Sequence, residues 1–321
     1  MLNLTNVENQ KLDFLLEIPF DIGIFASGYE SRSSHLAKNL DLSKIKNKIV
    51  LGFDENSDNA VRQKNDRFYA EWGFTSLVIS SQEERLIYAE LINLFEKVGK
   101  KQEINILVDY TSMARIWYSG ILNFIRLQNS GCVNVYLNYS IGLHEETLVD
   151  YNYSSINSIP FHEGTLSTNN KTLLVLAIGF SPYLIKSVIE EIEPNTTIGI
   201  LPIPNYEDTY KEFTDKIKDD ILTGDISEWL NSPINDLESI FRTYAEISNI
   251  NLSTKDIIFL SLGPKIFTLA SLLVSQRFPQ VTCLYLKSAN RSQLDIRAAG
   301  DFVCSKITYK QLGHKETIDL I

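Results

Sequence analysis

The chain has 321 residues, of which 44% are apolar and 22% are charged, and its formal net charge at pH 7 is −10. This size and composition are typical of a globular protein of about two domains. The negative charge argues against non-specific nucleic-acid binding, which relies on lysine and arginine. The N-terminus lacks a signal-like segment, and no run approaches about 18 apolar residues. We therefore expect a cytoplasmic protein without membrane contact, with its three cysteines as free thiols.

In the first half of the chain, short apolar runs alternate with helical patterns, which predicts βαβ units and a parallel sheet. Strands are expected at about 21–27, 48–54, 75–80, 104–110 and 132–139, and helices at 31–41, 58–72, 82–99 and 113–129. The runs are nearly all apolar rather than alternating, as expected for strands that are covered on both faces.

The segment 145–171 is rich in Tyr, Asn, Ser and Thr, and it is interpreted as an inter-lobe connection with room for a short edge hairpin. The strand and helix pattern then repeats. Strands are expected at 172–178, 197–203, 256–262 and 281–286, and helices at 182–192, 207–222, 233–249 and 264–277. We expect an all-helical insertion at 225–251, and a tail that adds a terminal strand or covers an edge.

The spacing of these runs indicates an internal duplication. Gly28 ends one apolar run and Gly179 ends another, an offset of 179 − 28 = 151. The fold class predicted is therefore α/β, with two tandem Rossmann-like lobes, each a mostly parallel sheet flanked by helices. The lobes are 1–144 and 172–321, and the cleft between two such lobes is a natural place for a small molecule.

Ligands of open parallel sheets bind beyond the carboxyl ends of the strands. After the first predicted strand the sequence reads Ser27-Gly28-Tyr29-Glu30-Ser31-Arg32-Ser33-Ser34. Gly28 permits a tight turn, the next helix would point free N–H groups at an anion, and Arg32 offers a charged fork suited to phosphate. The candidate ligand-binding residues here are Ser27, Gly28, Tyr29, Arg32 and Ser33. Dinucleotide and P-loop motifs are absent, and the alternative is an ordinary capped helix with Glu30 and Arg32 in solvent.

Two further turns carry candidates. Asp54 follows the second predicted strand, where an acid can hold a ribose hydroxyl or simply lie in a solvated turn. The fourth strand is followed by Asp109-Tyr110-Thr111-Ser112-Met113-Ala114-Arg115. A carboxylate at the end of an apolar strand needs a partner, or its pKa rises. Arg115 in a first helical turn indicates an anionic partner, which is Asp109, Glu30 or a ligand. Candidate ligand-binding residues here are Thr111, Ser112 and Arg115, and the alternative is a structural Asp109–Arg115 pair.

The second lobe is expected to have kept the fold and lost most of the charged set. Ser261 stands where the first lobe has Asp109, although Gly263 and Lys265 could still contribute to a shared cleft. We therefore expect one main site, in the first lobe. The four histidines show no metal-ligand spacing, and no metal or other cofactor is expected.

The Gly/Ser turn after the first strand and the polar turn after the fourth resemble those of the Rossmann-like CARF and SAVED sensor domains of bacterial anti-phage defence systems. That resemblance implies a cyclic or linear oligonucleotide ligand, a pocket across a pseudo-twofold axis and, since no effector domain follows, a separate effector protein. The leading hypothesis is a two-lobed binder of a nucleotide or other phosphorylated ligand.

Two alternatives remain open at this point. In the first, the protein is an enzyme that acts on an N-glycosidic or phosphoester bond, with Glu30 and Asp109 as the acid/base or nucleophile pair. In the second, it is a scaffold that holds a partner protein through an aromatic surface. The aromatic residues of that surface are Tyr151, Tyr153, Tyr206 and Tyr210.

Overall fold

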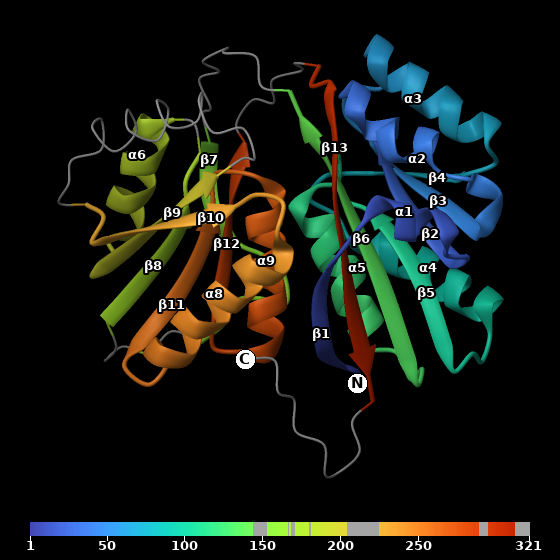
Figure 1. The fold of residues 1–321 in the computed structure, drawn as a ribbon. Coiled ribbons are helices and arrows are strands. Elements are labelled where there is room, and N and C mark those ends of the chain that lie inside the picture. The colour runs from blue at the N-terminus through green and yellow to red at the C-terminus, as the bar shows by residue number, and fades with distance from the viewer. Residues whose placement is uncertain are drawn as a thin grey trace. The chain divides into compact units, whose positions relative to one another are not determined.

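The computed structural model describes residues 1–143, 153–165, 167, 171–179, 181–203, 225–288 and 295–311. The chain divides into two compact units (Figure 1). Unit 1 comprises Met1–Glu145 and Gln293–Leu320, and unit 2 comprises Glu146–Ser292. No helix in the described ranges is long and apolar enough to cross a membrane.

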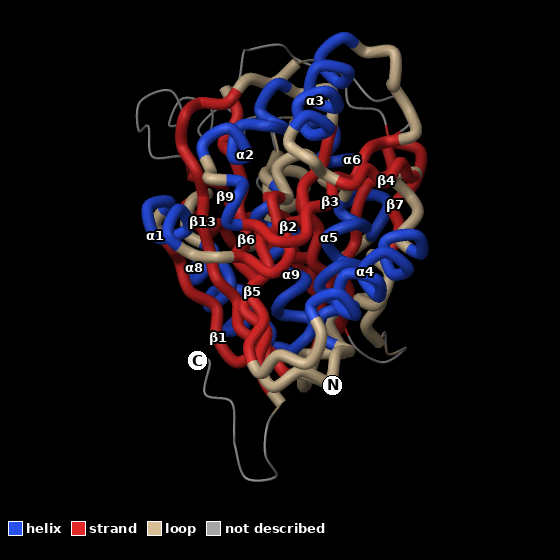
Figure 2. The backbone as a smooth tube through the Cα atoms, turned by 90° about the vertical axis from the view of Figure 1, so that its right-hand side faces the viewer, coloured by secondary structure: helices blue, strands red, loops and turns tan. Residues whose placement is uncertain are grey.

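Unit 1 is built on a seven-stranded sheet in the order β1-β13-β6-β5-β2-β3-β4 (Figure 2). Its strands are β1 (Asn3–Gln10), β2 (Phe20–Ser27), β3 (Ile45–Phe53), β4 (Thr75–Ile79), β5 (Glu103–Asp109), β6 (Cys132–Gly142) and β13 (Ala298–Lys310). The five strands from β4 to β6 are parallel, whereas β13 runs antiparallel to both β6 and β1. The helices are α1 (Leu12–Glu17), α2 (His35–Asn39), α3 (Ala60–Glu71), α4 (Arg85–Val98) and α5 (Arg115–Arg126), with 3-10 turns η1 (Ser31–Ser34) and η2 (Leu42–Lys44).

The parallel strands form because their residues are apolar on both faces. Every residue of β2 is buried. On one side Phe25 packs against Tyr69 of α3 and, edge to face at a centroid separation of 5.3 Å, against Phe74. The order β4-β3-β2-β5-β6 reverses its direction between β2 and β5, and this topological switch point is where doubly wound sheets bind ligands.

Unit 2 repeats this topology in a six-stranded sheet with the order β10-β9-β8-β11-β12-β7. Its strands are β7 (Tyr153–Ser158), β8 (Lys171–Ala177), β9 (Thr196–Ile203), β10 (Glu228–Pro233), β11 (Lys255–Ser261) and β12 (Thr282–Ser288), and its described helices are α6 (Pro182–Ile192), α8 (Leu237–Asn251) and α9 (Lys265–Arg277). All are parallel except β7. Two mostly parallel sheets flanked by helices confirm the predicted fold class.

The segment 225–251, predicted to be all helix, contains a strand. Residues Glu228–Pro233 form β10, which pairs in parallel with β9, and only α8 after it is helical. Gly199 of β9 leaves room for the indole of Trp229. A Cβ added to Gly199 would lie only 2.8 Å from Cε3 of that indole. The helix predicted at 207–222 lies outside the described residues.

Unit 2 interrupts unit 1 in the sequence. β7 follows β6 in the sequence but pairs with β12 of unit 2, and β13 follows β12 but pairs with β6 of unit 1. The sequence prediction placed the whole tail to residue 321 in the second lobe, and this was wrong for β13. The reason is that β6 offers an open edge on which β13 pairs from Cys132 to Gly142, and β1 then closes the outer edge of β13.

Candidate functional site

The two polar turns singled out in the sequence lie against each other at the switch point of unit 1. They follow β2 and β5, which are neighbours in the sheet. A Cβ added to Gly28 would lie 3.3 Å from Cβ and 3.6 Å from Oγ of Ser112. The absence of a side chain at Gly28 therefore lets the second turn approach, and the residues predicted after these strands form one polar cluster.

Hydrogen bonds hold the turn after β2 in a single shape. The Gly28 amide donates to Oγ of Ser33 at 3.0 Å, and that hydroxyl donates to the Ala26 carbonyl at 2.6 Å. From α3, Nδ2 of Asn65 donates to the carbonyls of Gly28 and Glu30, each at 3.0 Å. Asn65 was not identified from the sequence, where it is one of several polar residues of a predicted helix.

Arg32 lies inside the cluster rather than in solvent, with only 7% of its surface exposed. Its Nε donates to Glu30 at 2.7 Å, and its Nη1 donates to the Tyr139 hydroxyl and the Ser140 carbonyl, each at 3.2 Å. Burial disfavours the charge, but Tyr139 and Glu30 outweigh it and hold the pKa of Arg32 above its usual range. Within the described ranges, its hydrogen bonds use Nε and Nη1.

Asp109 organises the turn after β5. It is 1% exposed, and its Oδ1 accepts from the Thr111 amide at 3.1 Å, from the Thr111 hydroxyl and from Nδ2 of Asn138 at 3.2 Å. Oγ1 of Thr111 in turn accepts from the Ser140 amide at 2.9 Å. These bonds tie Asp109 to Thr111 and Asn138, so the carboxylate is part of the buried hydrogen-bond network of the turn. Arg115 is half-buried as the first residue of α5.

Two buried hydroxyls beside these groups have no hydrogen-bond partner among the described residues: Oγ of Ser112 and Oγ of Ser140. A buried polar atom without a partner costs about 1–3 kcal/mol, so such atoms are uncommon and call for an explanation. Ser140 was missed in the sequence, because β6 reads as an ordinary strand. The signal was the three polar residues Asn134, Asn138 and Ser140, which lie at even spacings in a largely apolar strand.

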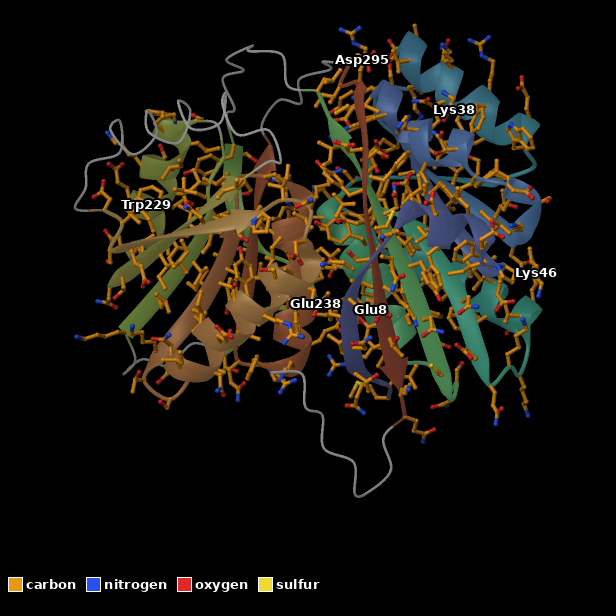
Figure 3. The ribbon with its side chains drawn as sticks, viewed as in Figure 1. Glu8, Lys38, Lys46, Trp229, Glu238 and Asp295 are labelled. Atoms are coloured by element: carbon orange, nitrogen blue, oxygen red, sulfur yellow. The ribbon has the colours of Figure 1, made fainter. Side chains whose placement is uncertain are left out.

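The backbone N–H groups expected to face an anion are already in use. The Ser31 amide donates to Oδ1 of Asp295 at 2.6 Å and its hydroxyl donates to Oδ2 at 2.5 Å (Figure 3 labels Asp295). The Arg32 amide donates to the Ile296 carbonyl at 3.2 Å. Moreover, η1 is a single turn of four residues, too short for a helix dipole. The predicted free donors at this helix start are therefore absent, and Asp295 was not foreseen.

The end of β3 carries an ion pair from α3. Arg62, 3% exposed, donates from Nε to Asp66 at 2.8 Å and from Nη1 to the Phe53 carbonyl at 2.9 Å. Asp66 also accepts from Oγ of Ser27 at 2.5 Å. Asp54, the predicted ribose acceptor, is exposed beside this group. Tyr29 is half-buried.

The matching point of unit 2 is occupied by backbone. A Cβ added to Gly263 would come 2.5 Å from the Ile178 carbonyl oxygen, and one added to Gly179 would clash with the Leu262 carbonyl. The participation of Gly263 and Lys265 in a shared cleft remains a prediction. Of the proposed aromatic surface, Tyr151, Tyr206 and Tyr210 lie outside the described residues. Tyr153 is half-buried and donates to Glu191 at 2.7 Å.

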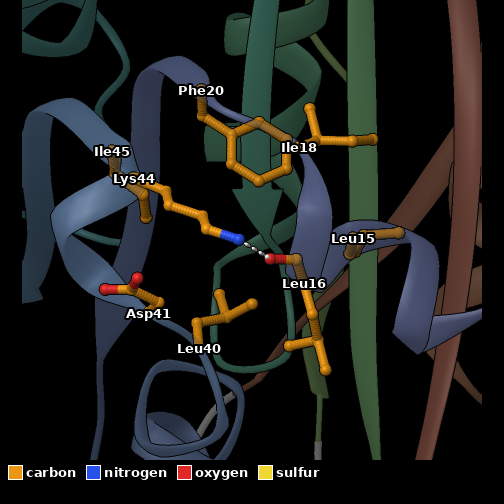
Figure 4. Close-up of a pocket in the computed structure, with 8 residues that line it drawn as sticks. All are labelled: Leu15, Leu16, Ile18, Phe20, Leu40, Asp41, Lys44 and Ile45. Carbon is orange, nitrogen blue, oxygen red and sulfur yellow. Dashed lines mark hydrogen bonds between the residues drawn. The ribbon is translucent and has the colours of Figure 1, made fainter.

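A separate, shallow depression lies at the amino ends of β2 and β3 (Figure 4). It is lined by Leu15, Leu16, Ile18, Phe20, Leu40, Asp41, Lys44 and Ile45. Nζ of Lys44 donates to the Leu16 carbonyl across it at 2.7 Å. Within the described ranges, no group of His, Cys, Asp and Glu side chains could hold a metal ion.

Fold and topology define a Rossmann-like α/β protein. No family model matches the chain, and no curated protein matches it. A universal stress protein from Archaeoglobus fulgidus DSM 4304 is similar at 12% identity and a TM-score of 0.24, over 84% of this chain and 98% of that one. A phosphoethanolamine N-methyltransferase of Haemonchus contortus is similar at 9% and 0.24, over 92% and 89%. At these TM-scores the likenesses carry no inference about ligand or activity, and neither protein is a CARF or SAVED domain.

Proposed function

We propose that unit 1 binds a nucleotide or another phosphorylated small molecule at the carboxyl ends of β2, β5 and β6. The observation that carries this proposal is the pair of buried, unpartnered hydroxyls of Ser112 and Ser140 beside a buried, charged Arg32. If these two positions served packing alone, apolar side chains would be more stable there, because a buried hydroxyl without a hydrogen bond lowers the stability of the folded state. A ligand that accepts hydrogen bonds from both hydroxyls accounts for them.

The chemistry of the cluster matches oxygen-rich ligands. A guanidinium donates to phosphate oxygens in a fixed plane, and hydroxyls both donate to and accept from phosphate and ribose oxygens. Arg32 is held in place before any ligand arrives by its bonds to Glu30, Tyr139 and the Ser140 carbonyl. Such preorganisation lowers the entropy cost of binding.

The role in bacterial defence and an oligonucleotide ligand of the CARF or SAVED kind are part of this proposal, and they rest on the resemblance of the two turns. A separate effector protein is proposed on the same ground. These finer statements depend on which ligand binds, so the panel in the experiment includes linear and cyclic oligonucleotides together with mononucleotides and dinucleotides.

The test is a thermal-shift screen of this panel, followed by calorimetric titration of each hit. A ligand at 100 times its Kd stabilises the folded state by about 2.7 kcal/mol. Ser112→Ala and Ser140→Ala should leave stability unchanged or raise it, because each removes an unpaired hydroxyl, and should weaken binding roughly tenfold. Arg32→Lys keeps the charge but loses the fork, so it should also weaken binding.

Ser76→Ala is the matched control, since Ser76 is exposed on β4 at the edge of the same sheet. It should bind like the parent protein. A panel without a single hit, or a hit whose affinity is the same in all three site variants, would overturn the proposal.

A further inference from the structure

We propose that Asp295 is a specificity-determining residue of this site. This inference rests on the proposed function of unit 1. Its carboxylate holds the amide and hydroxyl of Ser31, so a free phosphate ion is excluded. A nucleotide, which is also held at the hydroxyls of Ser112 and Ser140, displaces the Asp295 carboxylate from Ser31. The ligand class is thereby narrowed to molecules that combine a phosphate with a base or sugar, or that link several phosphates.

The segment that carries Asp295 is seated on the site residues themselves. Beyond the two bonds from Ser31, the Ile296 carbonyl accepts the Arg32 amide at 3.2 Å, and the Arg297 carbonyl accepts the Leu143 amide at 2.9 Å. A Cβ added to Gly142 would lie 2.5 Å from Cγ2 of Ile296 and 2.9 Å from Nη1 of Arg32. The approach of residues 295–297 to Arg32 therefore depends on Gly142 having no side chain.

The charges of the hydrogen-bonded set do not attract a simple anion. Carboxylates of Glu30, Asp66 and Asp295 outnumber the guanidinium groups of Arg32 and Arg62. An anion that approaches the Ser31 donors is opposed by the Asp295 carboxylate. It must take over donors that an attached carboxylate already occupies at a high effective concentration, in the millimolar range for a short tether.

A nucleotide overcomes this competition because it is itself tethered. Once its base or sugar is held at the hydroxyls of Ser112 and Ser140, its phosphate also acts at a high effective concentration. Asp295 is exposed, so its carboxylate can move into water, and the cost of this move is the loss of its two hydrogen bonds to Ser31. The contact therefore rejects weakly held anions and yields to anchored ones.

The experiment compares calorimetric Kd values of inorganic phosphate and of the tightest nucleotide from the panel, using the full chain. The variants are Asp295→Ala, which frees Ser31, and Asp295→Asn, which keeps the shape and removes the charge. Asp13→Ala on α1, exposed and leading into the amino end of β2, is the control for net charge. We expect the parent protein and the control to bind the nucleotide and not millimolar phosphate. Asp295→Ala should bind phosphate roughly tenfold tighter or more, with Asp295→Asn between them.

The outcomes separate the two proposals. If the parent protein binds a nucleotide but neither Asp295 variant gains affinity for phosphate relative to Asp13→Ala, the role of Asp295 is overturned and the binding site stands. If the parent protein already binds phosphate as tightly as Asp295→Ala does, the role of Asp295 is likewise overturned. If neither the parent nor any variant binds a nucleotide, the proposed function fails and this inference fails with it.

Discussion

Ala298 pairs with Gly142 across the β13–β6 boundary, although all of unit 2 lies between them in the sequence. The contact continues one step further, where the Leu143 amide donates to the Arg297 carbonyl at 2.9 Å. The end of β6 and the start of β13 are thus placed like the two arms of an antiparallel hairpin. Unit 2, with its own sheet, is inserted at the point where the hairpin turn would be.

The first prediction concerns this insertion. A shortened chain in which residue 143 is joined to residue 297 by a hairpin turn of roughly two to five residues, and which ends at 311, should fold as unit 1. Residues 1–144 alone should not, because β1 would lose the strand it pairs with and β6 would expose an apolar edge. Circular dichroism and urea unfolding of both chains check this. Cooperative unfolding of 1–144 alone would contradict it.

The second prediction concerns Gly52, which lies under the guanidinium of Arg62. A Cβ at this position would clash with Nη2 of Arg62. Gly52→Ala should therefore lower the free energy of unfolding by about 1–3 kcal/mol, the usual cost of overpacking. In an Arg62→Ala background the same change should cost much less, because the clashing group is gone. A double-mutant cycle by urea unfolding measures this coupling, and additive costs would show that the clash is relieved elsewhere.

The third prediction is a pH dependence centred on Asp21. Its carboxylate is buried and accepts from Lys101, from the Asn105 amide at 3.2 Å and from Lys46 at 3.2 Å. Burial alone would raise the pKa of Asp21, but these bonds outweigh it and hold the pKa below the ordinary 3.8. The folded state therefore favours the ionised form. Its contribution is full above about pH 4 and is lost as the pH falls through the lowered folded value.

The check compares the parent protein with Asp21→Asn by urea unfolding from pH 7 to pH 3. The variant should be less stable by about 1–3 kcal/mol near neutral pH, and the difference should shrink below about pH 4. A difference that stays constant through the acidic range would show that the ionised carboxylate is not the stabilising form.

The fourth prediction concerns His35, whose ring stacks on Phe302 of β13 at a centroid separation of 4.7 Å. Burial and the charge of Lys38 lower the pKa of His35 below 6.5, against a smaller opposing effect of the bond to the Gly300 backbone. The fold therefore prefers the neutral ring. Its stabilisation is complete above about pH 6.5 and is lost as the pH falls through the folded value. An NMR titration should give a pKa below 6.5, and His35→Gln should lose less stability on acidification than the parent protein. A pKa above 6.5 would contradict the assignment.

The inner parallel strands were predictable almost to the residue. The run expected at 21–27 is β2 at Phe20–Ser27, and the run expected at 104–110 is β5 at Glu103–Asp109. Burial on both faces requires an apolar side chain at nearly every position, so these strands carry their own signature. The same pattern placed the polar turns that follow them, and with them Arg32 and Ser112, at the switch point.

Positions that depend on a distant partner could not be predicted in this way. β1, β10 and β13 are edge or near-edge strands of mixed composition, and their places are decided by which sheet edge is open to them. Ser140 could have been found from the polar residues of β6, whereas Asp295 reaches the site because the chain returns from unit 2 to unit 1, and that return leaves no signal in the local sequence. The sequence by itself therefore determined the doubly wound class and half of the polar cluster, because a strand that is buried on both faces needs an apolar side chain at nearly every position. Only the tertiary structure decided which strands complete each sheet and which carboxylate faces Ser31, because pairing along an edge depends on segments far apart in the chain.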